Sequence, residues 1–189
     1  MAEKSLTRRM ALMTGAAALA TPSVLRAQEA SFSTTARRNA SSFKARNWRN
    51  HFKSLGSGAI LADIDSKVLH YWGPGENNYH LFPSSVPRSE ALTRRGYTRI
   101  VRKRIGPSWT PTASMRAADP SLPPFVEPGP GNPLGTHALY LSWPAYLIHG
   151  THDTRKIGRQ SSSGCIGLYN EHISALFAMA GVGTQVLLL

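Results

Sequence analysis

Short apolar runs separated by turn-forming residues make up most of the chain after residue 58. Runs rich in β-branched and aromatic residues, bounded by Gly, Pro or Ser, are typical of strands. The first two runs are separated only by Ser66 and Lys67, so we expect them to form a hairpin that ends at Gly73-Pro74-Gly75. The predicted strands cover residues 59–65, 68–72, 79–82, 97–105, 138–142, 146–149 and 184–189.

One segment near the end of the chain has helical periodicity instead. We expect Asn170 to be the N-cap, because its side chain can accept a hydrogen bond from the first turn, and Gly181 to end the helix. Between them, apolar residues recur at helical spacing: Ile173, Leu176, Phe177 and Ala180. The last run, 184–189, is apolar enough to lie at the centre of a sheet. Many strands, one helix and no alternation of strands with helices predict a mostly β (α+β) single domain.

Two stretches are poor in regular patterns. Residues 106–133 hold eight of the thirteen prolines, which predicts a long ordered loop. Trp109 in this loop and Trp143 after it are candidates to border a cleft. Residues 28–57 are rich in Ser, Ala, Asn and Arg, and we interpret them as a basic linker or arm. The folded domain is therefore predicted to cover residues 58–189.

Residues 1–27 have the pattern of an export signal. Arg8 and Arg9 precede an apolar stretch over 10–20, which is too short to span a bilayer. Ala27 is a small residue suited to cleavage. The run from Thr7 to Leu12 also resembles a twin-arginine signal, although an ordinary signal with two arginines is the alternative. We expect a periplasmic protein. Because no second apolar segment follows, we expect the mature chain to have no transmembrane anchor.

Composition narrows the functional classes. The 189 residues include 22 Lys and Arg against 10 Asp and Glu, a formal net charge of +12. This excess favours anionic surroundings such as nucleic acid, lipid or cell-wall polymer, and does not choose among them. The single cysteine excludes an intrachain disulfide framework and a cysteine-rich metal site. It leaves one thiol, which is either a packing residue or a chemical group.

The last third of the chain holds the candidate chemistry. His149 ends a predicted strand, and Cys165 follows in a Gly-flanked turn before the predicted helix. A thiolate attacks carbonyl carbons when a base or a positive field lies nearby, so this pair suits nucleophilic catalysis. The backbone N–H groups around Gly164 and Cys165 are candidates to hold an oxyanion. On spacing alone, a buried packing cysteine remains the alternative.

The surrounding residues sharpen this interpretation. The pattern His149-Gly150-Thr151, then Ile157-Gly158, then Ser162-Ser163-Gly164-Cys165-Ile166 resembles the signature of the L,D-transpeptidases, the YkuD-type (ErfK/YbiS-like) catalytic domain. The likeness extends over about residues 58–189. It implies that family's β-sandwich with one helix after the catalytic cysteine.

The resemblance also implies roles. Cys165 would be the acyl-accepting nucleophile and His149 its base. Gly150, Thr151, Ser162, Ser163 and Gly164 would orient the histidine and shape the oxyanion site, and Arg159 and Asn170 would contact substrate. The substrate would be a peptidoglycan stem, whose diaminopimelate–D-alanine bond is attacked. The acceptor would be another stem, a D-amino acid, an outer-membrane protein or, in an L,D-carboxypeptidase, water. No metal or organic cofactor is implied.

Three positions depart from the family pattern. Ser163 stands where His is usual, Gly167 where Arg is usual, and His172 where an acidic residue is usual. The loss of the arginine is the most serious, because that side chain can hold a substrate carboxylate. Candidates to replace it lie in the preceding loop: Arg155, Lys156 and Arg159.

Other functions stay open at this point. His149, His152, Cys165 and His172 are possible zinc ligands, but their spacing fits no strong zinc pattern. A serine hydrolase would use one of Ser161–Ser163, yet the chain lacks a Gly-x-Ser-x-Gly elbow. A non-catalytic wall-binding module would use Cys165 only for packing. Nucleic-acid binding fits the charge, but export and the lack of a nucleic-acid motif argue against it.

Overall fold

The computed structural model describes residues 45–75 and 78–189. The predicted signal segment 1–27 and most of the predicted arm 28–57 lie outside the described residues. The strands are β1 (Ala59–Asp63), β2 (Val68–Trp72), β3 (Tyr79–Pro83), β4 (Val86–Pro87), β5 (Gly96–Ile105), β6 (His137–Leu141), β7 (Leu147–His149), β8 (Gln160–Ser162), β9 (Ile166–Gly167) and β10 (Gln185–Leu188). The α-helices are α2 (Ala113–Ala118) and α3 (Asn170–Met179), with short 3-10 turns at Trp48–Asn50, Glu90–Leu92 and Thr154–Lys156.

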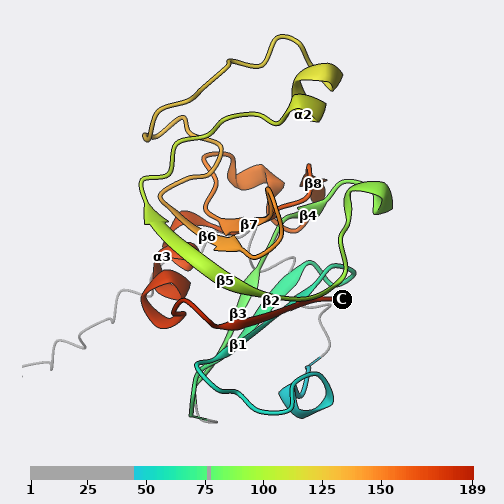
Figure 1. The fold of residues 1–189 in the computed structure, drawn as a ribbon, viewed down its shortest axis with the longest axis vertical. Helices are drawn as coiled ribbons and strands as arrows, with labels where there is room; N and C mark the ends of the chain where they lie inside the picture. Colours follow the sequence, from blue (N-terminus) through green and yellow to red (C-terminus); the bar gives the residue numbers. More distant parts are fainter. Residues whose placement is uncertain (1–44, 76–77) are drawn as a thin grey trace, which may run out of the picture. The chain divides into compact units, whose positions relative to one another are not determined.

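Eight strands form one curled sheet in the order β3-β2-β1-β10-β5-β6-β7-β9, and β4 pairs with β8 in a small parallel ribbon (Figure 1). The predicted hairpin is confirmed, because β1 and β2 pair antiparallel. The final strand β10 lies between β1 and β5, parallel to the first and antiparallel to the second. This confirms the prediction that the last apolar run is central in a sheet.

The central strands are buried on both faces, and alternate residues belong to different cores. Ile60 and Ala62 pack in the core beneath α3, together with Ile173 and Leu176. Ala59 and Leu61 point the other way, into a second core built with Phe52 and Leu55 from the segment before β1. The two-residue period of a strand explains the split. The mostly β prediction, with a helix after Cys165, is confirmed.

Some local predictions were incomplete or wrong. The proline-rich loop contains α2, capped by Thr112, whose side-chain oxygen accepts a hydrogen bond from Met115 N–H at 3.2 Å. The N-cap of α3 is Tyr169, and Asn170 is already the first helical residue. Its side-chain oxygen instead accepts a hydrogen bond from Thr136 N–H at 3.1 Å, a partner 34 residues away. A long-range contact therefore replaced the expected local cap.

Candidate active site

Two adjacent parallel strands bring His149 and Cys165 together. In the β7–β9 register, Ile148 lies opposite Ile166, and both are buried in the core. Side chains alternate along strands, so the neighbours of these two residues face away from that core. Leu147 and His149 thus share a face, and Cys165, just before β9, lies beside Leu147. The predicted pair is assembled by strand register across sixteen residues of chain.

His149 and Cys165 line the same cavity, of about 140 Å³. Trp109 and Met115 from the segment around α2 and Leu134 before β6 form part of its wall. Further lining residues come from the loop between β7 and β8, from β8 itself and from the residue after it: Thr151, Lys156, Ser161, Ser162 and Ser163. The predicted catalytic pair and the predicted serines are therefore collected in one place.

The imidazole of His149 is held in one tautomer. Its Nδ1 lies 2.5 Å from the carbonyl oxygen of Gly150. A carbonyl oxygen only accepts, so Nδ1 carries the proton and Nε2 is left as the basic nitrogen. The pKa of His149 is lowered to about 4, mainly by burial and also by the positive charge of Lys156, while the hydrogen bond to the Gly150 carbonyl opposes the shift. The ring is thus neutral and able to accept a proton at neutral pH.

Cys165 is a protonated thiol in the resting site. Burial raises its pKa to about 11, and a hydrogen bond from Leu147 N–H opposes the rise. The Sγ atom lies 3.5 Å from the carbonyl oxygen of Ala145, to which the thiol donates. Ala145 has a φ of 60°, in the left-handed region that a residue with a side chain seldom adopts. Strain of this kind is found at functional sites when the surroundings enforce it.

The turn before Cys165 is tied to the cysteine backbone by Ser162. Its hydroxyl donates to the Cys165 carbonyl oxygen at 2.6 Å and accepts from Gly164 N–H at 3.3 Å. Gly164 has a φ of +134°, which favours glycine, and it approaches the ring of Tyr146. Ser162 therefore shapes this turn rather than pointing a free hydroxyl at substrate.

Thr151 supports the loop after His149. It is buried, its Oγ1 accepts from Asp153 N–H at 3.1 Å, and the same hydroxyl donates to the Asp153 carbonyl oxygen at 3.4 Å. Gly150 is buried as well, and its N–H donates to the His137 carbonyl oxygen on β6 at 3.1 Å. Thr151 and Gly150 therefore stabilise the loop after His149 and its attachment to β6.

The three candidates to replace the arginine absent at position 167 differ in whether they line the cavity of His149 and Cys165. Arg155 is exposed and pairs with Asp153 at 2.8 Å, and Arg159 is exposed outside the cavity. Lys156 lines the cavity with His149 and Cys165. Asn170 was predicted to contact substrate, but its side-chain oxygen accepts a hydrogen bond from Thr136 N–H. Ala145 and Leu147 beside the thiol were missed, because no sequence signal marks backbone groups.

The rival zinc site is not assembled. Across residues 45–75 and 78–189, no group of three or more His, Cys, Asp and Glu side chains could hold a metal ion. His172 packs instead against the rings of Phe82 and Tyr169. Within the same residues, no helix is long and apolar enough to cross a membrane.

The chain is similar to known proteins over most of its length. Residues 57–188 match the family profile YkuD, the L,D-transpeptidase catalytic domain. A Fuscovulum blasticum protein, named as an L,D-transpeptidase in the ATP synthase subunits region (ORF 5), is 56% identical over 187 residues, covering 96% of this chain and 97% of that protein. The L,D-transpeptidase YbiS of Escherichia coli K12 is 42% identical over 138 residues, 70% of this chain but 44% of that protein.

Solved structures share the fold. An L,D-transpeptidase from Mycobacterium smegmatis is 20% identical, with a TM-score of 0.56, over 70% of this chain and 58% of that chain. At this identity the likeness concerns the fold alone. The chain thus spans almost all of the F. blasticum relative and less than half of the E. coli one.

Proposed function

The chain belongs to the L,D-transpeptidases, a family of cysteine-nucleophile acyltransferases, and on that premise we propose that it cleaves the diaminopimelate–D-alanine bond of a peptidoglycan tetrapeptide stem and transfers the acyl group to an amine. Cys165 is the nucleophile and His149 the base. The observation that supports this most strongly is their shared cavity, in which His149 keeps Nε2 unprotonated.

The reaction starts from a neutral thiol and a neutral imidazole. As Cys165 Sγ attacks the amide carbon, its proton passes to His149 Nε2 and the carbonyl oxygen becomes an oxyanion, for which the Cys165 backbone N–H is the candidate donor. The C–N bond then breaks, and His149 returns the proton to the departing amine of D-alanine. A thioester on Cys165 remains.

The second half reverses the first with a new amine. The acceptor amine attacks the thioester carbon, loses a proton to His149, and the C–S bond breaks. The thiolate of Cys165 takes the proton back from His149. A second diaminopimelate as acceptor gives a 3-3 cross-link, and a D-amino acid or an outer-membrane protein gives an exchanged or anchored product. Water would make the enzyme an L,D-carboxypeptidase.

The proposal includes the compartment. Peptidoglycan stems lie outside the cytoplasmic membrane, and the signal pattern of residues 1–27 suits export to the periplasm by the twin-arginine route. The high positive charge suits work beside anionic wall and membrane polymers.

The test is to incubate the purified protein with a disaccharide-tetrapeptide and to follow intact protein and products by mass spectrometry. We expect an acyl adduct on Cys165 that lacks D-alanine, followed by dimers or exchanged stems, and neither in Cys165→Ala. Alkylation of the resting thiol is a weaker test, since a pKa of about 11 leaves little thiolate at neutral pH.

A folded wild-type protein that forms no adduct and no product would support the alternative of a non-catalytic wall-binding member. Adduct formation with release of a tripeptide stem alone, in the presence of amines, would instead assign water as the acceptor. Circular dichroism of both proteins establishes that each is folded.

A further inference from the structure

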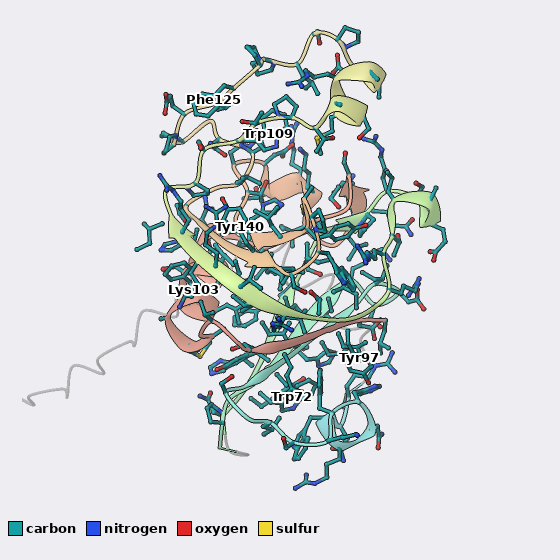
Figure 2. The ribbon with its side chains drawn as sticks, in the orientation of Figure 1. Trp72, Tyr97, Lys103, Trp109, Phe125 and Tyr140 are labelled. Carbon is teal, nitrogen blue, oxygen red and sulfur yellow. The ribbon has the colours of Figure 1, made fainter. Side chains whose placement is uncertain are left out.

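A second and larger cavity, of about 370 Å³, also reaches Cys165. It shares Trp109, Met115, Leu134 and Cys165 with the cavity of His149. The residues that line only this cavity include Arg102 and Arg104 on β5, Tyr140 on β6 and Ala145 in the turn before β7. Figure 2 shows Tyr140 on β6 and Trp109 in the segment leading to α2. The nucleophile thus lies where two cavities meet.

A β-bulge turns the two arginines toward this cavity. The pairing of β5 with β6 shifts by one residue between Ile100 and Arg102. Ile100 is buried in the core beneath α3, and without the extra residue Arg102 and Arg104 would face the same way. The bulge reverses the alternation, so that Lys103 takes the α3 side and donates to the Phe177 carbonyl oxygen at 2.5 Å.

The charge of this cavity is unbalanced. Arg102 lies over the ring of Tyr140, with its guanidinium carbon 3.6 Å from the ring centroid, which holds the group in place. No acidic side chain lines the cavity among the described residues. Neither Arg102 nor Arg104 is among the described ion pairs, which join Arg46, Arg95 and Arg155 to carboxylates. Two arginines therefore line a cavity that reaches the nucleophile, and neither guanidinium group has an anionic partner within residues 45–75 and 78–189.

Proton transfer to and from His149 indicates which cavity takes the amines and which takes the acyl group of the substrate. The departing amine and the attacking amine both exchange a proton with His149, so both belong in the cavity that His149 lines. The acyl group bonded to Sγ must extend away from them, into the larger cavity. Resting on the function proposed above, we propose that Arg102 and Arg104 bind the free carboxylate on the D-centre of the donor diaminopimelate. Guanidinium groups suit this task because they match a carboxylate with paired hydrogen bonds.

The test compares two donors that differ only in this group, a tetrapeptide stem with the free D-centre carboxylate and its carboxamide. Single-turnover acylation of the full chain is measured by intact-protein mass spectrometry. We expect Arg102→Gln and Arg104→Gln each to slow acylation by the carboxylate donor about tenfold or more, with little change for the carboxamide. Arg102→Lys, which keeps the charge, should restore part of the rate.

Arg99→Gln is the matched control, because Arg99 is exposed on the same strand and lines neither cavity. It should leave acylation by both donors unchanged, and the KM of a D-amino acid acceptor should be unchanged in all variants. Equal losses with both donors, or the same loss in Arg99→Gln, would overturn this inference alone. A folded wild-type protein that acylates with neither donor would overturn it together with the proposed function.

Discussion

The Oγ atom of Ser85 occupies the space in which a side chain at Gly167 would begin, since a Cβ atom there would lie 2.4 Å from it. The two backbones are joined as an antiparallel bridge, with Ser85 N–H donating to the Gly167 carbonyl oxygen at 2.8 Å and Gly167 N–H to the Ser85 carbonyl oxygen at 3.1 Å. Both residues are buried. An arginine at 167, usual in the resembled motif, therefore has no room unless Ser85 moves.

Gly167→Ala should destabilise the protein by about 1–3 kcal/mol, because the new methyl group meets Ser85 in a packed site. Ser85→Ala removes the clashing oxygen, so the double variant should recover most of the loss. Urea unfolding of the four proteins measures the coupling, expected at about 1–2 kcal/mol. Simple additivity of the two changes would show that Ser85 is not the obstacle.

Ser162→Ala should slow acylation about tenfold, because the turn before Cys165 loses the hydroxyl that bridges Gly164 N–H and the Cys165 carbonyl oxygen. Ser89→Ala is the matched control, because Ser89 is exposed and lines neither cavity, and its rate should stay within about twofold of wild type. The rate of acyl-adduct formation measures both. Equal losses in the two variants would contradict the assigned role of Ser162.

The pH dependence of acylation should have its acid limb near the pKa of His149, about 4. Protonated His149 cannot accept the thiol proton, so the rate falls as pH drops through that value. Because the Cys165 pKa is about 11, the thiol stays protonated over the neutral range and the rate should be nearly flat there. An acid limb near 6.5 would instead indicate a solvent-exposed base.

Stability should fall on acidification because of two histidines, buried His70 and half-buried His149. Burial lowers the pKa of His70 and of His149 from 6.5 to about 4. Between those values the unfolded state binds more protons than the folded state, so stability is lost as pH drops through this window, by at most about 3 kcal/mol for each group. In His70→Phe, the free energy of unfolding measured with urea should fall less steeply between neutral and acidic pH.

Asn170→Ala should lower stability by about 1–2 kcal/mol, because Thr136 N–H loses its acceptor beside Gly150. Since the side chain holds the loops around His149, acylation should slow while the KM of the acceptor stays constant. Urea unfolding and initial rates give the two quantities. A raised KM at unchanged stability would restore the earlier interpretation of Asn170 as a substrate contact.

Much of the fold was available from local patterns. Alternating and continuous apolar runs located the long strands, and helical spacing after Asn170 located α3, because burial imposes those periods on the sequence. The spacing of His149, Gly164 and Cys165 made them candidates, and the resemblance to the L,D-transpeptidase signature singled them out from a packing cysteine. These features depend on neighbours within a few residues or on residue chemistry itself.

The tertiary structure decided what depends on distant partners. The one-residue bulge in β5 turns Arg102 and Arg104 from the core face to the cavity of Cys165. Ser85 closes the space at Gly167, and Thr136 takes the side chain of Asn170. Each of these features depends on two segments that are far apart in the sequence and in contact in the fold. The periodicity of either segment alone therefore does not predict the register shift, the close contact or the long-range hydrogen bond.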